Sequence, residues 1–100
     1  EVLYDVKTAA APHLSGVDNV TITASGDVLV AEDGGDMQIV LLAPSGIVLP
    51  IVQIVGQDES EICGPAFDPS FQRLYFSSQT GPLNLDSDGI TYEISRIVRV

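Results

Sequence analysis

Short apolar runs separated by polar turns recur along the chain, and they predict strands rather than helices. The turns are rich in glycine, proline, serine and aspartate, and Ala24-Ser25-Gly26-Asp27 is typical of a hairpin connection. β-Branched residues are dense, and no window shows a helical period of about 3.6 residues. We therefore predict an all-β fold, with strands at residues 17–23, 28–31, 37–42, 47–55, 62–68, 73–77 and 90–94.

One strand-turn-strand pattern occurs twice, 45 residues apart, as VTITASGDVLVAED (Val20 to Asp33) and PAFDPSFQRLYFSS (Pro65 to Ser78). A repeat of about 40 to 50 residues with several strands is typical of a β-propeller blade. Such units bury their faces against neighbours, and about three or more are needed for a stable core. We expect about two blades made of four-stranded antiparallel sheets, as a fragment of a larger propeller.

The pattern also gives blade boundaries. We assign residues 1–16 to an outer strand and connection from a preceding blade, 17–55 to a first blade and 56–100 to a second, whose outer strand begins near Ser95. Pro50 cannot donate to a ladder, so its strand belongs at a sheet edge. The consecutive apolar residues of VLVA, IVLL, IVLP and LYF indicate that both faces of each sheet are covered, as between neighbouring blades, and favour a propeller over a two-sheet sandwich.

Composition limits the possible partners. A hydrophobic content of 45% predicts a folded chain despite the net charge of -10. Four basic residues are too few for binding to nucleic-acid phosphates or anionic lipid. No apolar run approaches the roughly 18 residues of a membrane span, and the first residues do not resemble a signal peptide. Open sheet edges are expected to favour self-association.

Three segments carry a family resemblance: GVDNVTITASGDVLVAEDGGDMQIVLLAPSG, SEICGPAFDPSFQRLYFSSQTG and GITYEI. Together they resemble the C-terminal portion of PhoX-type alkaline phosphatases and their bacterial relatives. The resemblance implies a propeller whose channel holds calcium and iron, and a periplasmic or secreted enzyme that hydrolyses small-molecule phosphate esters. Two features depart from the family: Phe71 replaces a turn glycine, and the chain lacks the tryptophan-containing segment that carries an iron-binding cysteine.

Several oxygen-bearing residues stand where strands of a propeller reach its axis, at the starts of inner strands and the ends of second strands. Ca²⁺ takes six to eight oxygen ligands, which several blades can supply together. Glu61 is the strongest candidate ligand, followed by Glu32, Asp33 and Asn19, the last beside Asp18. The alternative is that these residues cap turns.

The remaining reactive residues have ordinary structural interpretations. We expect Cys63 to act as a small buried hydrophobe rather than a soft-metal ligand. His13 is expected in a surface loop and Arg73 in solvent, while Ser77 and Ser78 are expected as polar residues at a strand end.

Three functions stay open at this stage. The first is a metal-dependent phosphoric-ester hydrolase, of which this chain supplies one wall of the site and is inactive alone. The second is a calcium-dependent lactonase-like propeller. The third is a non-catalytic binding propeller with structural calcium.

Overall fold

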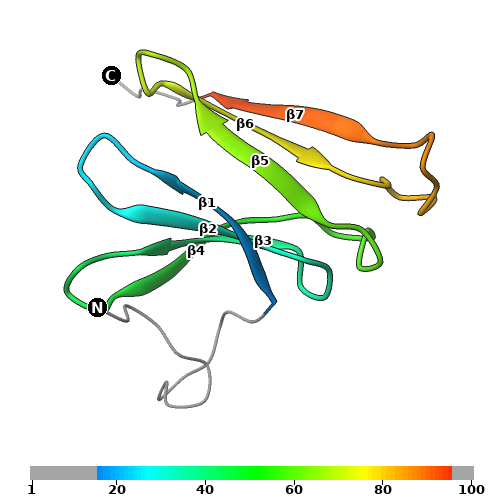
Figure 1. The fold of residues 1–100 in the computed structure, drawn as a ribbon, viewed down its shortest axis with the longest axis horizontal. Helices are drawn as coiled ribbons and strands as arrows, with labels where there is room; N and C mark the ends of the chain where they lie inside the picture. Colours follow the sequence, from blue (N-terminus) through cyan, green and yellow to red (C-terminus); the bar gives the residue numbers. More distant parts are fainter. Residues whose placement is uncertain (1–15, 96–100) are drawn as a thin grey trace.

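The computed structural model describes residues 16–95, which form seven β-strands in two antiparallel sheets (Figure 1). The strands of sheet A are β1 (Val17–Ile22), β2 (Val28–Glu32), β3 (Gln38–Leu42) and β4 (Val48–Gln53). Those of sheet B are β5 (Ile62–Phe67), β6 (Arg73–Ser78) and β7 (Ile90–Ser95). The all-β prediction is confirmed for this part of the chain. A membrane-spanning helix is not found within it.

Sheet A is a simple meander in the order β1-β2-β3-β4, joined by two tight turns of the same kind. In the β1–β2 turn, the Gly26 N–H donates to the Thr23 carbonyl at 3.0 Å, and in the β3–β4 turn Gly46 donates to Ala43 at 2.9 Å. Gly26 and Gly46 have φ values of 86° and 90°. A type I turn followed by a left-handed residue fits the right-handed twist of the flanking strands. β4 lies at the edge of the sheet, as Pro50 predicted.

Sheet B follows the order β5-β6-β7, with an eleven-residue insert, residues 79–89, between its last two strands. Hydrogen bonds within the insert close it locally: the Leu83 N–H donates to the Asp88 carboxylate at 2.9 Å. Ser95 belongs to β7 and does not begin a new strand. The fourth strand expected after it lies outside the described residues, as does the strand expected at residues 1–5.

The two hairpins of the repeat match in pairing but differ by one residue in turn length. Ile22 pairs with Val28 at the end of the first hairpin, and Phe67 pairs with Leu74 at the end of the second. The offset is therefore 45 residues between β1 and β5 but 46 between β2 and β6. The constant 45-residue spacing taken from the sequence aligns Leu29 with Leu74 and is therefore one residue out of phase for β2 and β6, where Val28 corresponds to Leu74.

Phe71 takes the position of Gly26 in the second hairpin. Its N–H donates to the Asp68 carbonyl at 3.0 Å, and its φ of 58° is also left-handed. A bulky residue rarely adopts this conformation. The turn keeps its geometry because the Asp68 carboxylate accepts the N–H groups of Gln72 and Arg73, each at 3.0 Å. The missing glycine has therefore not opened the turn.

The main core lies where one face of sheet A packs on sheet B. Figure 1 shows sheet B stacked over sheet A, with β5 lying beside β1 and β2. The side chains of this core come from both sheets and the loop after β2: Leu29, Ala31, Met37, Ile39, Ile62, Leu74 and Phe76. The Phe76 ring stacks on Tyr92 with ring centroids 5.4 Å apart. The packing of these apolar side chains joins the two sheets into one body.

The outward faces of the two sheets differ. Sheet A has a second apolar cluster on the face away from sheet B, formed by Val30, Val40 and Leu42 with Val28 and Val48 around them. On the outward face of sheet B, the Ser77 hydroxyl hydrogen-bonds to that of Thr91 at 2.9 Å, and Arg73 pairs with Glu93 at 3.1 Å. The prediction of apolar cover on both faces is right for β2 and β3 of sheet A, but wrong for the IVLP run at β4, because Ile47 and Leu49 are 59% and 52% exposed. It is wrong for sheet B, because Tyr75 of the LYF run lies on this polar face between two buried neighbours.

Candidate metal centre

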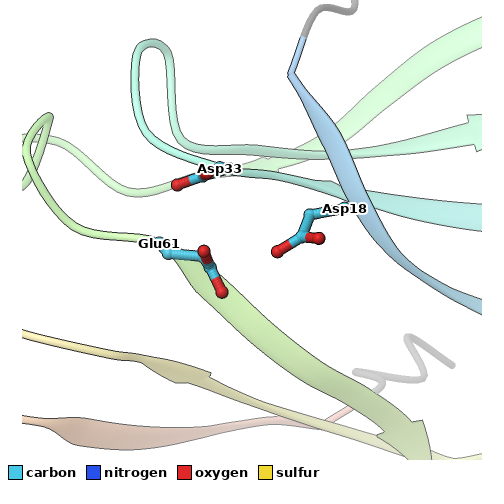
Figure 2. Close-up of side chains that lie close together, drawn as sticks. All are labelled: Asp18, Asp33 and Glu61. Carbon is cyan, nitrogen blue, oxygen red and sulfur yellow. The ribbon is translucent and has the colours of Figure 1, made fainter.

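Three carboxylates from separate parts of the chain meet beside the starts of β1 and β5. Asp18 lies in β1, Asp33 follows the end of β2, and Glu61 precedes β5. Oxygen atoms of the three side chains lie within 4.8 Å of one another. Figure 2 shows the carboxylates of Asp18 and Glu61 facing the space between the two strands, with Asp33 beside them. The fold thus brings together residues that are far apart in sequence.

A β-bulge directs Asp18 toward this cluster. Val17 pairs with Glu32 and Asn19 pairs with Ala31, so Asp18 is the extra residue of β1 and has no partner of its own on β2. Bulges increase the local twist and re-aim side chains, and they are common beside functional sites. The bulge therefore explains why Asp18 joins the cluster although regular alternation along β1 gives no reason to expect it.

The loop after β2 is held against the segment that leads into Glu61. The Gly35 N–H donates to the Asp58 carbonyl at 3.1 Å. At Gly34, with a φ of 70°, an added Cβ would stand 3.2 Å from the same carbonyl oxygen. The Asp33 N–H also donates to the Gly16 carbonyl at 2.8 Å, which ties the loop to the start of β1. These contacts fix the backbone on both sides of the cluster.

The electrostatics of the cluster are those of like charges held together. Partial burial raises the pKa of Glu61. Asp18 raises this pKa further, through its negative charge and through a hydrogen bond to Glu61. Asp33 acts on Glu61 in the same two ways. Arg73 is the only basic residue among residues 16–95. It lies on the outward face of sheet B, where it pairs with Asp68 and Glu93. Within this part of the chain, no basic side chain balances the three carboxylates.

The other two predicted ligands lie around the cluster in different ways. Glu32 is 2% exposed, and its carboxylate accepts the Gln38 N–H at 3.0 Å. Glu32 lies apart from the cluster because neighbouring residues of a strand point to opposite faces. Asp33, the next residue, is the one that reaches the cluster. The side-chain amide of Asn19 donates to the Ile62 carbonyl at 3.3 Å and approaches Asp18 at 3.4 Å. Asn19 therefore links β1 to β5 directly beside the acids.

The structure agrees with the ordinary interpretations of Ser78 and Arg73, and only in part with that of Cys63 as a buried hydrophobe. Cys63 is half-buried, and burial followed by the charges of Glu61 and Asp18 raises the pKa of its thiol, which disfavours a thiolate ligand. Ser78 is fully buried and hydrogen-bonds to Ser60 at 2.7 Å. Arg73 is exposed, as expected. His13 lies outside the described residues.

The donor set of the cluster fits a hard cation. Its three side chains offer carboxylate oxygens, and Ca²⁺ and Mg²⁺ are bound by oxygen ligands. Three negative charges lie close together here, and a bound cation would compensate them. Three carboxylates provide at most six oxygens, so further ligands would complete a calcium site.

Comparison with known protein families gives a match over most of the chain. A family model described as alkaline phosphatase PhoX matches residues 4–81, which include all three acids of the cluster. Neither a curated protein nor a solved structure matches the chain significantly. Because the match extends over most of the sequence, this chain belongs to the PhoX alkaline phosphatase family.

Proposed function

We propose that this chain forms one wall of the metal site in a phosphomonoester hydrolase of the PhoX type. Asp18, Asp33 and Glu61 would hold a calcium ion from one side. Other parts of a larger propeller, including any iron-binding segment, would supply the remaining ligands. The observation that carries the proposal is the convergence of the three carboxylates within the region matched by the family.

Family membership supports metal-dependent phosphatase chemistry in general terms. PhoX proteins are metal-dependent and typically exported. When bound, a divalent cation would polarise the phosphoryl oxygens of the substrate ester. The described residues of this chain would serve as ligands and positioning groups, because the cluster itself offers only acids and Asn19. We expect the isolated chain to be inactive on phosphate esters for that reason.

The arrangement of the sheets supports the propeller. The first strands of the two sheets, β1 and β5, lie side by side, as inner strands of neighbouring blades do. The far face of sheet A carries an apolar cluster, so this sheet is apolar on both faces, as is a blade with neighbours on both sides. The polar outward face of sheet B gives no such support, and a blade that follows it would make a more polar contact.

Calcium binding to the 100-residue chain tests the metal site. Isothermal titration should detect binding by the wild-type chain, weakened on the order of tenfold or more in Glu61→Gln, since each carboxylate contributes charge and oxygen ligands. Glu59→Gln is the matched control, because Glu59 is an exposed acid two residues away and outside the cluster. Equal affinity of Glu61→Gln and wild type would remove Glu61 from the site. An absence of binding at millimolar calcium would show that these acids alone cannot hold the ion.

Phosphatase activity tests the function. A protein that carries this segment at full length should hydrolyse p-nitrophenyl phosphate and lose that activity when a chelator is added. Hydrolysis of a lactone without phosphatase activity would instead support the lactonase-like alternative. Calcium binding without either activity would support the non-catalytic propeller.

A further inference from the structure

β4 forms an outer edge of sheet A, and the direction of its free backbone groups can be worked out from the neighbouring turn. Among the described strands, β4 pairs only with β3. The Ala43 N–H donates to the Ile47 carbonyl at 3.0 Å. Because hydrogen-bonded and non-bonded pairs alternate along an antiparallel ladder, the backbone groups of Leu49 point toward β3. Those of Val48 and Pro50 point away, into the open edge.

This edge combines exposed apolar side chains with an absence of charge. Ile47, Leu49 and Ile51 are 59%, 52% and 43% exposed. Residues 37–57, which include all of β3 and β4, contain no Asp, Glu, Lys or Arg, although the chain as a whole has a net charge of -10. Two copies of the chain repel each other over most of their surface, and this stretch is where that repulsion is weakest.

Pro50 interrupts the edge at its centre. Its nitrogen lies on the open side, where every other residue type would present an N–H to an added strand. The register of β3 and β4 also shifts beside it, because Ile39 pairs with Val52 and Val40 with Pro50, which leaves Ile51 as a bulged residue. Prolines and bulges are the features by which natural sheets protect exposed edges from pairing with another chain.

We propose that the outer edge of β4 is able to pair with the β4 edge of a second copy of this chain, and that Pro50 keeps this pairing weak in the wild-type chain. The pairing would join β4 to the β4 strand of the other copy in antiparallel fashion around a two-fold axis, which makes the same residues face one another from both sides. Of the two sheet edges that β4 and β7 form among the described strands, the β4 edge suits a second copy better, because β7 carries the charged Glu93.

Replacing Pro50 tests the proposal on the 100-residue chain. In Pro50→Val, each copy gains one outward N–H, and sedimentation at several protein concentrations should show self-association on the order of tenfold tighter than in wild type. Pro82→Val is the matched control, because Pro82 lies exposed in the insert and outside every described strand. If Pro50→Val associates no more tightly than Pro82→Val, Pro50 does not guard the edge.

A second substitution separates edge pairing from misfolding. Pro50→Val combined with Leu49→Glu places a carboxylate beside the opened edge in each copy, so like charges meet only if the β4 edges pair. The double variant should return to the sedimentation behaviour of wild type, with a circular dichroism spectrum that still shows β-structure. Tight association that persists in the double variant would overturn the proposal, because unfolded or non-specifically sticky chains would not be dispersed by one charge at this position.

Discussion

Sheets A and B are built from related hairpins, yet they use their outward faces differently. In sheet A, consecutive residues of β2 are buried, because Leu29 and Ala31 face sheet B while Val30 faces the second apolar cluster. In sheet B, β6 alternates between buried Leu74 and Phe76 and the more exposed Arg73, Tyr75 and Ser77. The same hairpin geometry therefore supports an apolar or a polar outer face. The two sheets differ in what they can pack against rather than in how they fold.

The largest expected effect is on the core that the sheets share. Phe76 is 3% exposed and stacks on Tyr92 between the two sheets. Truncating it removes apolar contacts and leaves a cavity, so Phe76→Ala should lower the free energy of unfolding by about 3–5 kcal/mol in urea denaturation. A loss below about 1 kcal/mol would mean that the sheets do not depend on this contact.

A pair of isosteric substitutions compares the outward faces directly. Val40 is fully buried in the second cluster of sheet A, so Val40→Thr buries a hydroxyl and should lower the free energy of unfolding by about 1–3 kcal/mol. Thr91→Val on the exposed face of sheet B loses the hydrogen bond to Ser77 but should change stability by less than about 1 kcal/mol. Similar losses at both positions would show that the two faces are equally covered in solution.

The strands and sheets could be predicted well because each turn carries strong local signals. Gly26, Gly46 and Pro50 mark hairpins and an edge strand through backbone chemistry that a single residue determines. Face assignment was less reliable. Tyr75 is aromatic and reads as part of an apolar run, yet it lies on the polar face of sheet B, because its ring tolerates partial exposure.

The candidate site was harder to predict, since a shift of one residue along a strand changes which side chain reaches the site. Glu32 and Asp33 are neighbours in the chain, and the ending of β2 decides which of them reaches the cluster. The sequence pattern places Asp18 at the start of a strand beside Asn19, but it does not single out Asp18 as a ligand. Its direction follows from the bulge between Val17 and Asn19, and no sequence signal announces a bulge there.

The two related turns provide a finer comparison of backbone strain. At Phe71 a side chain occupies a left-handed conformation, and its ring centroid lies 5.4 Å from that of Phe67. Phe71→Gly and Phe71→Ala both lose the ring contact, but only glycine relieves the strain. We expect Phe71→Gly to be more stable than Phe71→Ala by about 1 kcal/mol. Gly26→Ala, which introduces the same strain with open space around the new Cβ, should cost a similar amount.

Equal stability of the two Phe71 variants in thermal or urea unfolding would mean that the second turn relaxes out of the left-handed conformation. In that case Gly26→Ala in the shorter β1–β2 turn would still be destabilising. The contrast between the two turns would then show that the longer β5–β6 turn is the one able to relax. The comparison therefore does not depend on the absolute stability of either variant.

The smallest effects are expected from pH, and two carboxylates should respond in opposite directions. The pKa of Glu61 is raised by burial and by Asp18 and Asp33, so the folded chain binds its proton more tightly than the unfolded chain. Without a cation, the contribution of Glu61 should make the chain more stable as pH falls from above the raised pKa toward the ordinary glutamate pKa. Glu61→Gln should flatten that part of the stability profile.

Asp68 should behave in the opposite way. Hydrogen bonds from Ser70 and from the N–H groups of Arg73 and Gln72, with the charge of Arg73, hold its pKa below the ordinary value. Its contribution is present above the ordinary aspartate pKa and is lost as pH falls through the lowered one. Asp68→Asn should remove this acid-side loss in a pH series of urea unfolding curves. A profile with the same sign for both residues would contradict the assigned causes.

The extra residue in the β5–β6 turn affects how the history of such repeats can be traced. An insertion inside a strand turns every later side chain to the other face unless a bulge absorbs it, whereas an insertion between paired strands leaves Phe67 opposite Leu74 and the core intact. Copies of a duplicated unit can therefore drift in turn length while selection keeps their pairing unchanged. An alignment by fixed sequence spacing therefore loses register at each altered turn, whereas an alignment strand by strand keeps equivalent pairs together.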